Sequence, residues 1–301
     1  MRKIKKVFFL VFVVSLFVMC NQKEKKNEDK ETILKGSVSI LVDETLMPIM
    51  EDQVDVFESS YDAKIKLVPK SESEAVISLF NIKSGIAVLS RNLTNEENKV
   101  LEQKKISPKI TKFAIDAIAF ISNKSDKDTL IDLKNVIEFM QGKTSSKIKG
   151  LVFDNPNSST VRYITTLAGV KSIPESGAYS FKTNDEVIKF VAQNEGMIGV
   201  LGINWLAQPM PSMQQFVDKV NIMSVKGLSG QNYYAPSQNN MAEGTYPLAR
   251  DLYIINCQGY TGLGMGFASF VAGDIGQRIV LKSGLLPARI PGRKIKIRNK
   301  I

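Results

Sequence analysis

The sequence predicts an α/β protein built around a mainly parallel sheet, and two features of its pattern indicate this class. Short apolar segments typical of buried strands alternate along the chain with segments whose apolar residues follow helical spacing. Strands that alternate with helices form βαβ units, in which helices cover a parallel sheet. The length of 301 residues is enough to bury a substantial core in one large or two medium domains.

These elements are expected in alternating order. The strands are expected at 37–42, 63–70, 86–90, 113–124, 147–153, 197–202 and 246–256. The helices are expected at 43–61, 71–85, 94–105, 130–143, 161–170, 183–193 and 264–284. The third helix begins with a capping box, in which Thr94 is followed three positions later by Glu97. The glycine-rich segment 262–267 lacks full G-x-G-x-x-G spacing and predicts a tight turn instead of a nucleotide loop.

The N-terminus has the pattern of an export signal. Four basic residues precede a short apolar run, and Cys20 ends it. This cysteine resembles the lipidation site of a bacterial lipoprotein, so we expect residues 1–19 to be a signal peptide and 20–35 a solvated tether. Met19 departs from the small residue usual at its position, and an uncleaved signal anchor is the alternative. In both cases the rest of the chain lies outside the cytoplasm, attached to a membrane.

The composition excludes several kinds of catalytic or metal site. The chain has no histidine, which removes the usual general base, the Ser-His and Cys-His pairs and the commonest zinc ligand. It has only two cysteines, Cys20 and Cys257, so thiolate metal sites are also excluded. Cys257 lies in an apolar strand and is expected to be a buried, inert thiol without a disulfide partner. We therefore expect no enzyme and no cofactor.

The charge of the chain favours an anionic ligand, though weakly. The formal net charge is +10, of which the four basic residues of the signal segment contribute +4. Lysines and arginines are scattered without interleaved aromatic residues, which argues against a nucleic-acid partner.

Three consecutive hydroxyl residues mark the expected junction of a strand and a helix. The segment "DNPNSSTVRY" places Ser158, Ser159 and Thr160 where an apolar strand ends and helical spacing begins. One hydroxyl is enough to cap a helix. Three of them beside the free N–H groups of a helix N-terminus can also hold an anion.

Several stretches, taken in their order, resemble the PstS-type phosphate-binding proteins of bacterial ABC transporters. They are "VDETL", "AVLSRNLTNEE", "FAIDAIAFISNKS", "LIDLKNVIEFMQGK", "FDNPNSSTVRYI", "NEGMIGVLGINW", "YPLARDLYIIN" and "GDIGQRIVLKSGLLPARIPGR". The resemblance implies a two-lobe type II periplasmic-binding-protein (Venus-flytrap) architecture. In this division 36–114 plus 247–301 form the first lobe and 115–246 the second. It also implies a monomer that binds inorganic phosphate between the lobes and delivers it to the ABC permease of an inner membrane.

The resemblance also implies which residues bind phosphate. Ser158, Ser159 and Thr160 match the family's Ser-Gly-Thr turn, and Thr45 matches the threonine of its first binding loop. Ser71 matches a serine at the start of the second helix, where the family is glycine-rich and this chain has Glu72 and Glu74. The full set of expected ligands is Thr45, Ser71, Arg91, Asp154, Ser158, Ser159 and Thr160.

The charged ligands depart from the family pattern. Better-known members have an aspartate after the third strand and an arginine before the Ser-Gly-Thr turn, whereas this chain has Arg91 and Asp154 in those places. We expect Arg91 to donate to phosphate in a bidentate fashion, and Asp154 to orient Arg91 or accept the phosphate proton. Asp154 as a simple turn cap is the alternative. Arg250 is expected to form an ion pair at the base of the cleft, and Asp116 to be a hinge or site residue.

Three other functions are alternatives to this one. The first is a binding protein of the same fold for another oxyanion, or a sensor without a transporter. The second is a structural lipoprotein that has kept the fold and lost the ligand. The third is an exported hydrolase with Ser158 or Ser159 as nucleophile and Lys143 or Lys147 as base, and nothing in the sequence pairs these residues at a suitable spacing.

Overall fold

The computed structural model describes residues 31–81, 85–143 and 148–292. The expected signal peptide, the lipidation site Cys20 and most of the tether lie outside these residues. From Thr32 onward the chain forms one compact unit. No helix within the described residues is long and apolar enough to cross a membrane.

The first part of the sheet is built around β1 (Gly36–Asp43). β2 (Ala63–Lys70) and β3 (Ile86–Leu89) pair with it in parallel on either side, and β12 (Ala249–Asn256) pairs antiparallel with β3. The connections are the short helix η1 (Glu44–Leu46), α2 (Met47–Ser60), α3 (Glu72–Asn81) and α4 (Asn95–Gln103). Alternate residues of β1 face opposite helices: Ile40 and Val42 pack in the core with residues of α2, whereas Leu41 packs with residues of α3.

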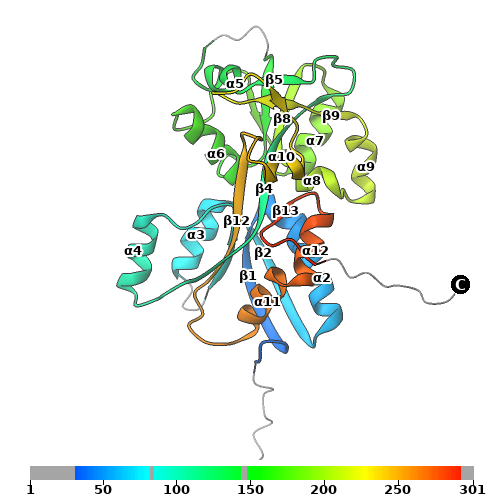
Figure 1. Ribbon diagram of the computed structural model, residues 1–301. Helices are drawn as coiled ribbons and strands as arrows, with labels where there is room; N and C mark the ends of the chain where they lie inside the picture. The colour runs from blue at the N-terminus through cyan, green and yellow to red at the C-terminus, as the bar shows by residue number, and fades with distance from the viewer. Residues whose placement is uncertain (1–30, 82–84, 144–147, 293–301) are drawn as a thin grey trace, which may run out of the picture. The chain divides into compact units, whose positions relative to one another are not determined.

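A single long strand, β4 (Lys109–Asn123), joins the two parts of the sheet (Figure 1). Residues 109–117 of β4 pair with β12, and 118–121 pair with β8 (Met197–Gly202). β8 continues in parallel to β6 (Gly150–Phe153), which pairs with β7 (Ala178–Ser180). β9 (Val220–Ile222) and β13 (Leu286–Pro287) add to the edges of β4. Within the described residues this gives the order β2-β1-β3-β12-β4-β8-β6-β7.

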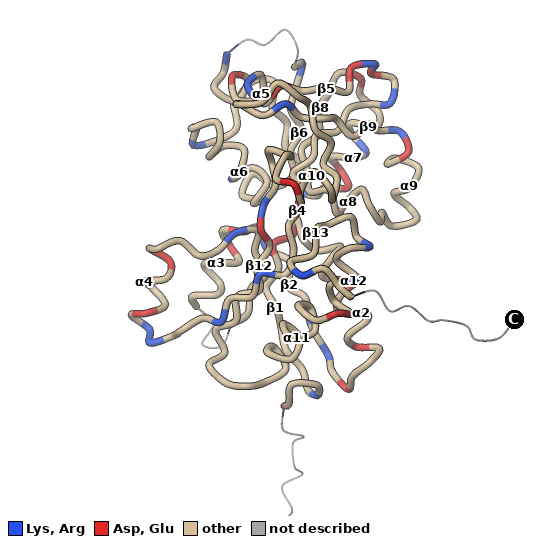
Figure 2. Tube along the Cα trace, viewed as in Figure 1, with Lys and Arg blue, Asp and Glu red and all other residues tan. Residues whose placement is uncertain are grey.

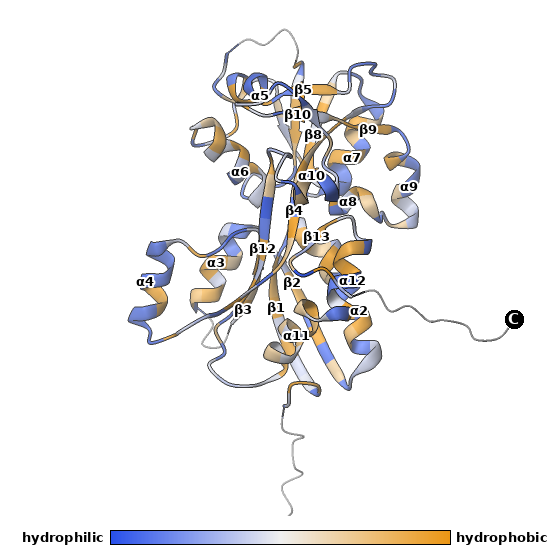
Figure 3. Ribbon diagram, viewed as in Figure 1, coloured by the Kyte–Doolittle hydropathy of each residue, from blue (hydrophilic) through white to orange (hydrophobic). Residues whose placement is uncertain are grey.

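The remaining elements surround this sheet. β5 (Leu130–Asp132), β10 (Ser224–Lys226) and β11 (Tyr233–Tyr234) form a separate three-stranded sheet among the described residues. The other helices are α5 (Leu133–Met140), α6 (Ser159–Ala168), α7 (Asn184–Gln193), α8 (Asn204–Ala207), α9 (Pro211–Val217), α10 (Gln238–Ala242), α11 (Leu263–Ala272) and α12 (Asp274–Lys282). The strands in the centre of Figure 3, such as β4 and β8, are largely apolar, while the helices show mixed faces.

The structure confirms the α/β class and corrects three of its details. The sheet is mixed instead of mainly parallel, because β4 and β12 run antiparallel to their neighbours. The helix expected at 264–284 is two helices, since Gly273 has an extended backbone (φ −83°, ψ 175°) that ends α11. The segment expected as a helix at 130–143 begins with the strand β5.

Two local expectations are confirmed. Thr94 and Glu97 form the capping box at the start of α4. Cys257 is a free, buried thiol at 2% exposure, and burial raises its pKa to about 11. A thiol with such a pKa stays protonated at neutral pH, so Cys257 is a core residue without thiolate reactivity.

Candidate anion-binding site

The first of the three hydroxyls caps α6. Strand β6 ends at Phe153, and the chain turns through residues 154–157 into the helix. Ser158 Oγ accepts a hydrogen bond from the backbone N–H of Val161 at 3.2 Å and donates to the carboxylate of Asp154. Ser158 is therefore the N-cap, and Ser159 and Thr160 are not needed for capping.

The other two hydroxyls are buried and point to a different role. Ser159 Oγ lies 3.0 Å from Thr45 Oγ1 and accepts from Arg250 Nη1 at 2.9 Å. Thr160 is fully buried, and its Oγ1 has no hydrogen-bond partner. A buried hydroxyl without a partner costs free energy, and such a group calls for a functional explanation.

Arg250 supplies the positive charge beside these hydroxyls. It lies on β12 directly opposite Asp116 on β4, and its Nε and Nη2 atoms are 2.9 and 2.8 Å from Asp116 Oδ2. Its remaining donors reach Ser159 Oγ and, at 3.4 Å, Thr45 Oγ1. Gly202 leaves room for the pair, because a Cβ there would lie 3.0 Å from Asp116 Oδ2. The expectation that Arg250 forms an ion pair is confirmed, and its contacts to Ser159 and Thr45 extend it.

Thr45 brings β1 into the same cluster. Asp43, the last residue of β1, accepts from both the N–H (3.1 Å) and the Oγ1 (3.0 Å) of Thr45 through Oδ1. The Thr45 carbonyl in turn accepts from Trp205 Nε1 at 2.8 Å. We call Thr45, Ser159, Thr160 and Arg250 the donor cluster. Its members come from η1, α6 and β12, elements far apart in the chain.

Two buried carboxyl groups border the donor cluster. Burial, together with the negative charge of Glu72, raises the pKa of Asp43 to about 6. Burial also raises the pKa of Asp154 to about 7, although the hydrogen bond from Ser158 acts in the opposite direction. Asp43 Oδ2 is buried without a partner, whereas Asp154 Oδ2 accepts from Asn184 Nδ2 at 3.2 Å. Both groups therefore titrate near neutral pH.

These raised pKa values predict that the ligand-free protein loses stability as the pH rises. The ordinary aspartate pKa is 3.8, so between that value and about 6 to 7 the folded state holds protons that the unfolded state has released. This contribution is complete below pH 3.8 and is lost as the pH rises through 6 and 7. Urea unfolding in phosphate-free buffer at about pH 5 and about pH 8 should show the decrease. Asp154→Asn should make the decrease smaller, and an unchanged pH dependence would contradict the assignment.

Arg91 and Ser71 have other partners than those expected. Arg91 donates through Nη1 and Nη2 to the two oxygens of Glu97 at 2.7 and 2.8 Å, and through Nε to Glu72 Oε1 at 2.9 Å. Asp154 accepts from Ser158 and Asn184, so it does not orient Arg91. Ser71 Oγ donates to Glu74 Oε2 at 3.0 Å and caps α3. The structure therefore brings Thr45, Ser158, Ser159, Thr160 and Asp154 together, while Arg91 and Ser71 are engaged by neighbouring glutamates.

The nearby polar residues are structural. Asp251 forms an exposed ion pair with Lys112, and Gln238 donates to the carbonyls of Leu281 and Leu285 at the end of α12. Figure 2 shows acidic and basic positions next to each other on β12 and at the start of α3. Arg250, which the sequence predicts outside the ligand contacts, is the residue that the structure adds to the candidate site.

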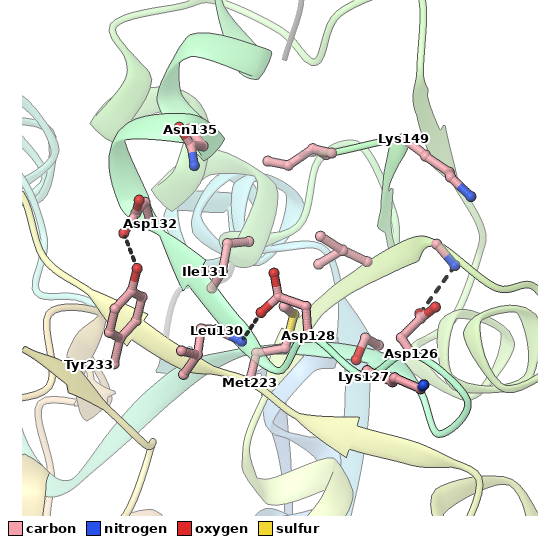
Figure 4. Close-up of a pocket in the computed structure, with 14 residues that line it drawn as sticks. Asp126, Lys127, Asp128, Leu130, Ile131, Asp132, Asn135, Lys149, Met223 and Tyr233 are labelled. Atoms are coloured by element: carbon pink, nitrogen blue, oxygen red, sulfur yellow. Dashed lines mark hydrogen bonds between the residues drawn. The ribbon is translucent and has the colours of Figure 1, made fainter. Parts of the chain in front are cut away.

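A cavity of about 380 Å³ lies elsewhere and shares no residue with the donor cluster. The side chains of Asp126, Lys127, Asp128, Asp132 and Lys149 line it, and Figure 4 shows the hydroxyl of Tyr233 bonded to Asp132. Its two lysines are accompanied by three carboxylates and no arginine among the described residues lines it, whereas the donor cluster has a buried guanidinium and the unpartnered hydroxyl of Thr160. We therefore base the functional argument on the donor cluster.

One family model and several phosphate-binding proteins match this chain. Residues 27–274 match the family model described as the PBP superfamily domain. The phosphate-binding protein PstS of Borreliella burgdorferi is 27% identical over 300 residues, which cover 94% of this chain and 98% of that protein. A candidate phosphate ABC transporter substrate-binding protein from Clostridium perfringens, solved with bound phosphate, gives a TM-score of 0.70 at 21% identity, covering 84% of this chain and 100% of that one. The crystal structure of PstS from Borrelia burgdorferi gives a TM-score of 0.53 at 25% identity, covering 84% and 99%.

Proposed function

This chain belongs to the PBP superfamily, and we propose that it binds inorganic phosphate and delivers it to an ABC importer. Its fold is the two-lobe type II periplasmic-binding-protein fold that the sequence predicts. We place the boundary between the lobes within β4, near residue 115, and again near residue 247. Proteins of this kind bind their ligand without transforming it, so the proposal assigns no catalytic residue.

The donor cluster is the observation that carries the proposal. Thr45, Ser159, Thr160 and Arg250 offer three hydroxyls and a guanidinium, and Thr160 Oγ1 has no other partner. The first turn of α6 adds N–H groups that favour negative charge. Each hydrogen bond to a charged group contributes roughly 1.5–3 kcal/mol. Several such bonds are enough for micromolar affinity or better.

For phosphate to bind at the donor cluster, hydrogen bonds between members of the cluster must be replaced by hydrogen bonds to phosphate. Ser159 Oγ is bonded to Thr45 Oγ1 and to Arg250, and these bonds connect the two parts of the sheet. We propose that the lobes separate to admit phosphate and then close with its oxygens in place of the Thr45–Ser159 bond. Trp205, which donates to the Thr45 carbonyl, would report this movement by its fluorescence.

The bordering carboxyl groups suit a ligand that carries a proton. A carboxylate next to an oxyanion repels it unless one of the two carries a proton. We propose that Asp154, as expected from the sequence, and Asp43 accept or share that proton. Sulfate has no proton at neutral pH, so the ionised carboxylates, which predominate above about pH 7, should exclude it.

The remaining roles are proposed from the sequence and the relatives. We propose that Cys20 carries a lipid anchor, that residues 20–35 are the tether, and that the protein acts as a monomer outside the cytoplasm. The sequence predicts Arg91 and Ser71 as direct ligands. Both side chains contact glutamates instead, so we do not include them among the proposed phosphate ligands.

Calorimetric titration tests this function. The chain from Thr32 onward, freed of carried-over phosphate, should bind phosphate saturably with about micromolar affinity. Excess sulfate at about pH 8, where both carboxyl groups are ionised, should leave that binding unchanged. No heat with phosphate would contradict the proposal, and equal competition by sulfate would contradict the role of the two carboxyl groups.

A further inference from the structure

The carboxylate of Glu72 occupies a set of donors that has the character of an anion site. Glu72 is the first residue of α3 and is only 1% exposed. It accepts from Ser90 Oγ at 2.9 Å, from Arg91 Nε at 2.9 Å and from Arg162 through both Nε and Nη2. Two guanidinium groups and a hydroxyl are a donor set typical of carboxylate or phosphate recognition.

Part of this donor set is held in place without Glu72. Arg91 keeps its two bonds to Glu97 and one from Nη1 to the Asn92 carbonyl. Arg162 lies in α6, whose backbone is set by the Ser158 cap. The Arg91 and Arg162 side chains are 21% and 34% exposed, so solvent reaches the group of donors. Removing the Glu72 carboxylate would leave a position for another anion in which Arg91 is already oriented.

This position lies beside the donor cluster. Arg162 follows Ser159 by three residues in α6, a spacing that places two side chains on one helix face. Besides burial, the charge of Glu72 is the largest cause that raises the pKa of Asp43. A ligand with a second anionic group next to its first would therefore meet a buried negative charge.

We propose that Glu72 is a specificity-determining residue whose carboxylate fills a second anion position formed by Ser90, Arg91 and Arg162. It thereby restricts the ligand to a single tetrahedral oxyanion and excludes diphosphates. The restriction to phosphate rests on the proposed function, whereas the filled anion position does not. A merely structural ion pair would hold α3 to α6 without leaving an anion site when the carboxylate is removed.

The test uses Glu72→Ala in the chain from Thr32 onward, with Glu74→Ala as the matched control. Glu74 lies in the same turn, is exposed and caps through Ser71, so its removal leaves Ser90, Arg91 and Arg162 untouched. Formate at about 100 mM should raise the thermal midpoint of Glu72→Ala by about 2 °C or more beyond any rise in the wild type and in Glu74→Ala. Pyrophosphate should bind Glu72→Ala at least about tenfold more tightly than the wild type.

The outcomes separate this inference from the proposed function. If the wild type binds phosphate and Glu72→Ala gains neither formate nor pyrophosphate binding, the inference is overturned. If no variant binds phosphate, the proposed function fails and the formate response still decides whether the position exists. Should Glu72→Ala not fold, Glu72→Gln keeps the volume and removes the charge. Its phosphate affinity should rise at least about threefold at low salt, and an unchanged or weaker affinity would overturn the inference.

Discussion

Arg250→Ala is expected to lower the free energy of unfolding by about 3–5 kcal/mol, because it leaves Asp116 buried without its ion-pair partner. The side chains of Arg250 and Asp116 are 2% and 0% exposed, so water cannot replace the lost contact. Arg250 also donates to Ser159, and its loss should abolish phosphate binding. Urea unfolding measures the first effect and calorimetry the second.

Two further variants separate folding from binding. Arg250→Lys keeps the charge and loses the forked geometry, so it should fold and bind phosphate at least about tenfold more weakly. Lys112→Ala removes the exposed partner of Asp251 on the neighbouring strand and should change stability by less than about 1 kcal/mol. Wild-type phosphate affinity in Arg250→Lys would show that the guanidinium is not a ligand.

Thr160→Val is expected to change stability and binding in opposite directions. Thr160 Oγ1 is buried and has no partner, so an isosteric methyl should stabilise the ligand-free fold by about 1 kcal/mol. The same change removes a donor to phosphate and should weaken binding by about 10- to 100-fold. Thermal unfolding and calorimetry on one preparation measure both effects.

Thr165→Val is the matched control in the same helix. Thr165 is also buried, but its Oγ1 donates to the carbonyls of Val161 and Arg162 at 2.9 and 3.0 Å. Its replacement should destabilise the fold and leave phosphate affinity unchanged. If Thr160→Val destabilised the protein as Thr165→Val does, Thr160 would be a structural residue and not a ligand.

The part of the site that depends on local sequence was predictable. Ser158, Ser159 and Thr160 follow an apolar strand and begin a helix, and Thr45 follows the first strand in the same way. Strand ends and helix starts can be read from periodicity and capping residues, so these positions were expected on the right elements.

The choice of ionic partners was not predictable. Arg91 binds Glu97, six residues away, and Glu72 at the start of α3, instead of the expected partner Asp154. Arg250 meets Asp116 only because β12 and β4 pair antiparallel in one register. Such contacts depend on strand pairing over more than 100 residues, which periodicity does not encode.

The fold, like the site, was predictable where it depends on local sequence and not where it depends on long-range strand pairing. Alternation of strands and helices indicated the α/β class, and the capping box at Thr94 and the buried Cys257 were confirmed because both depend on local pattern. The direction of β4 and β12 was not indicated, since an apolar strand reads the same in a parallel and an antiparallel sheet. The break at Gly273 was missed because the helical spacing of apolar residues continues on both sides of it.

A crystal structure of the chain from Thr32 onward grown with phosphate tests the central claim most directly, because it locates the ion. The account predicts phosphate oxygens within hydrogen-bond distance of Thr160 Oγ1, Ser159 and the Arg250 guanidinium, with the Thr45–Ser159 bond replaced. Phosphate bound only in the cavity lined by Asp126 and Lys149, or only at Arg91 with Glu72 displaced, would contradict it.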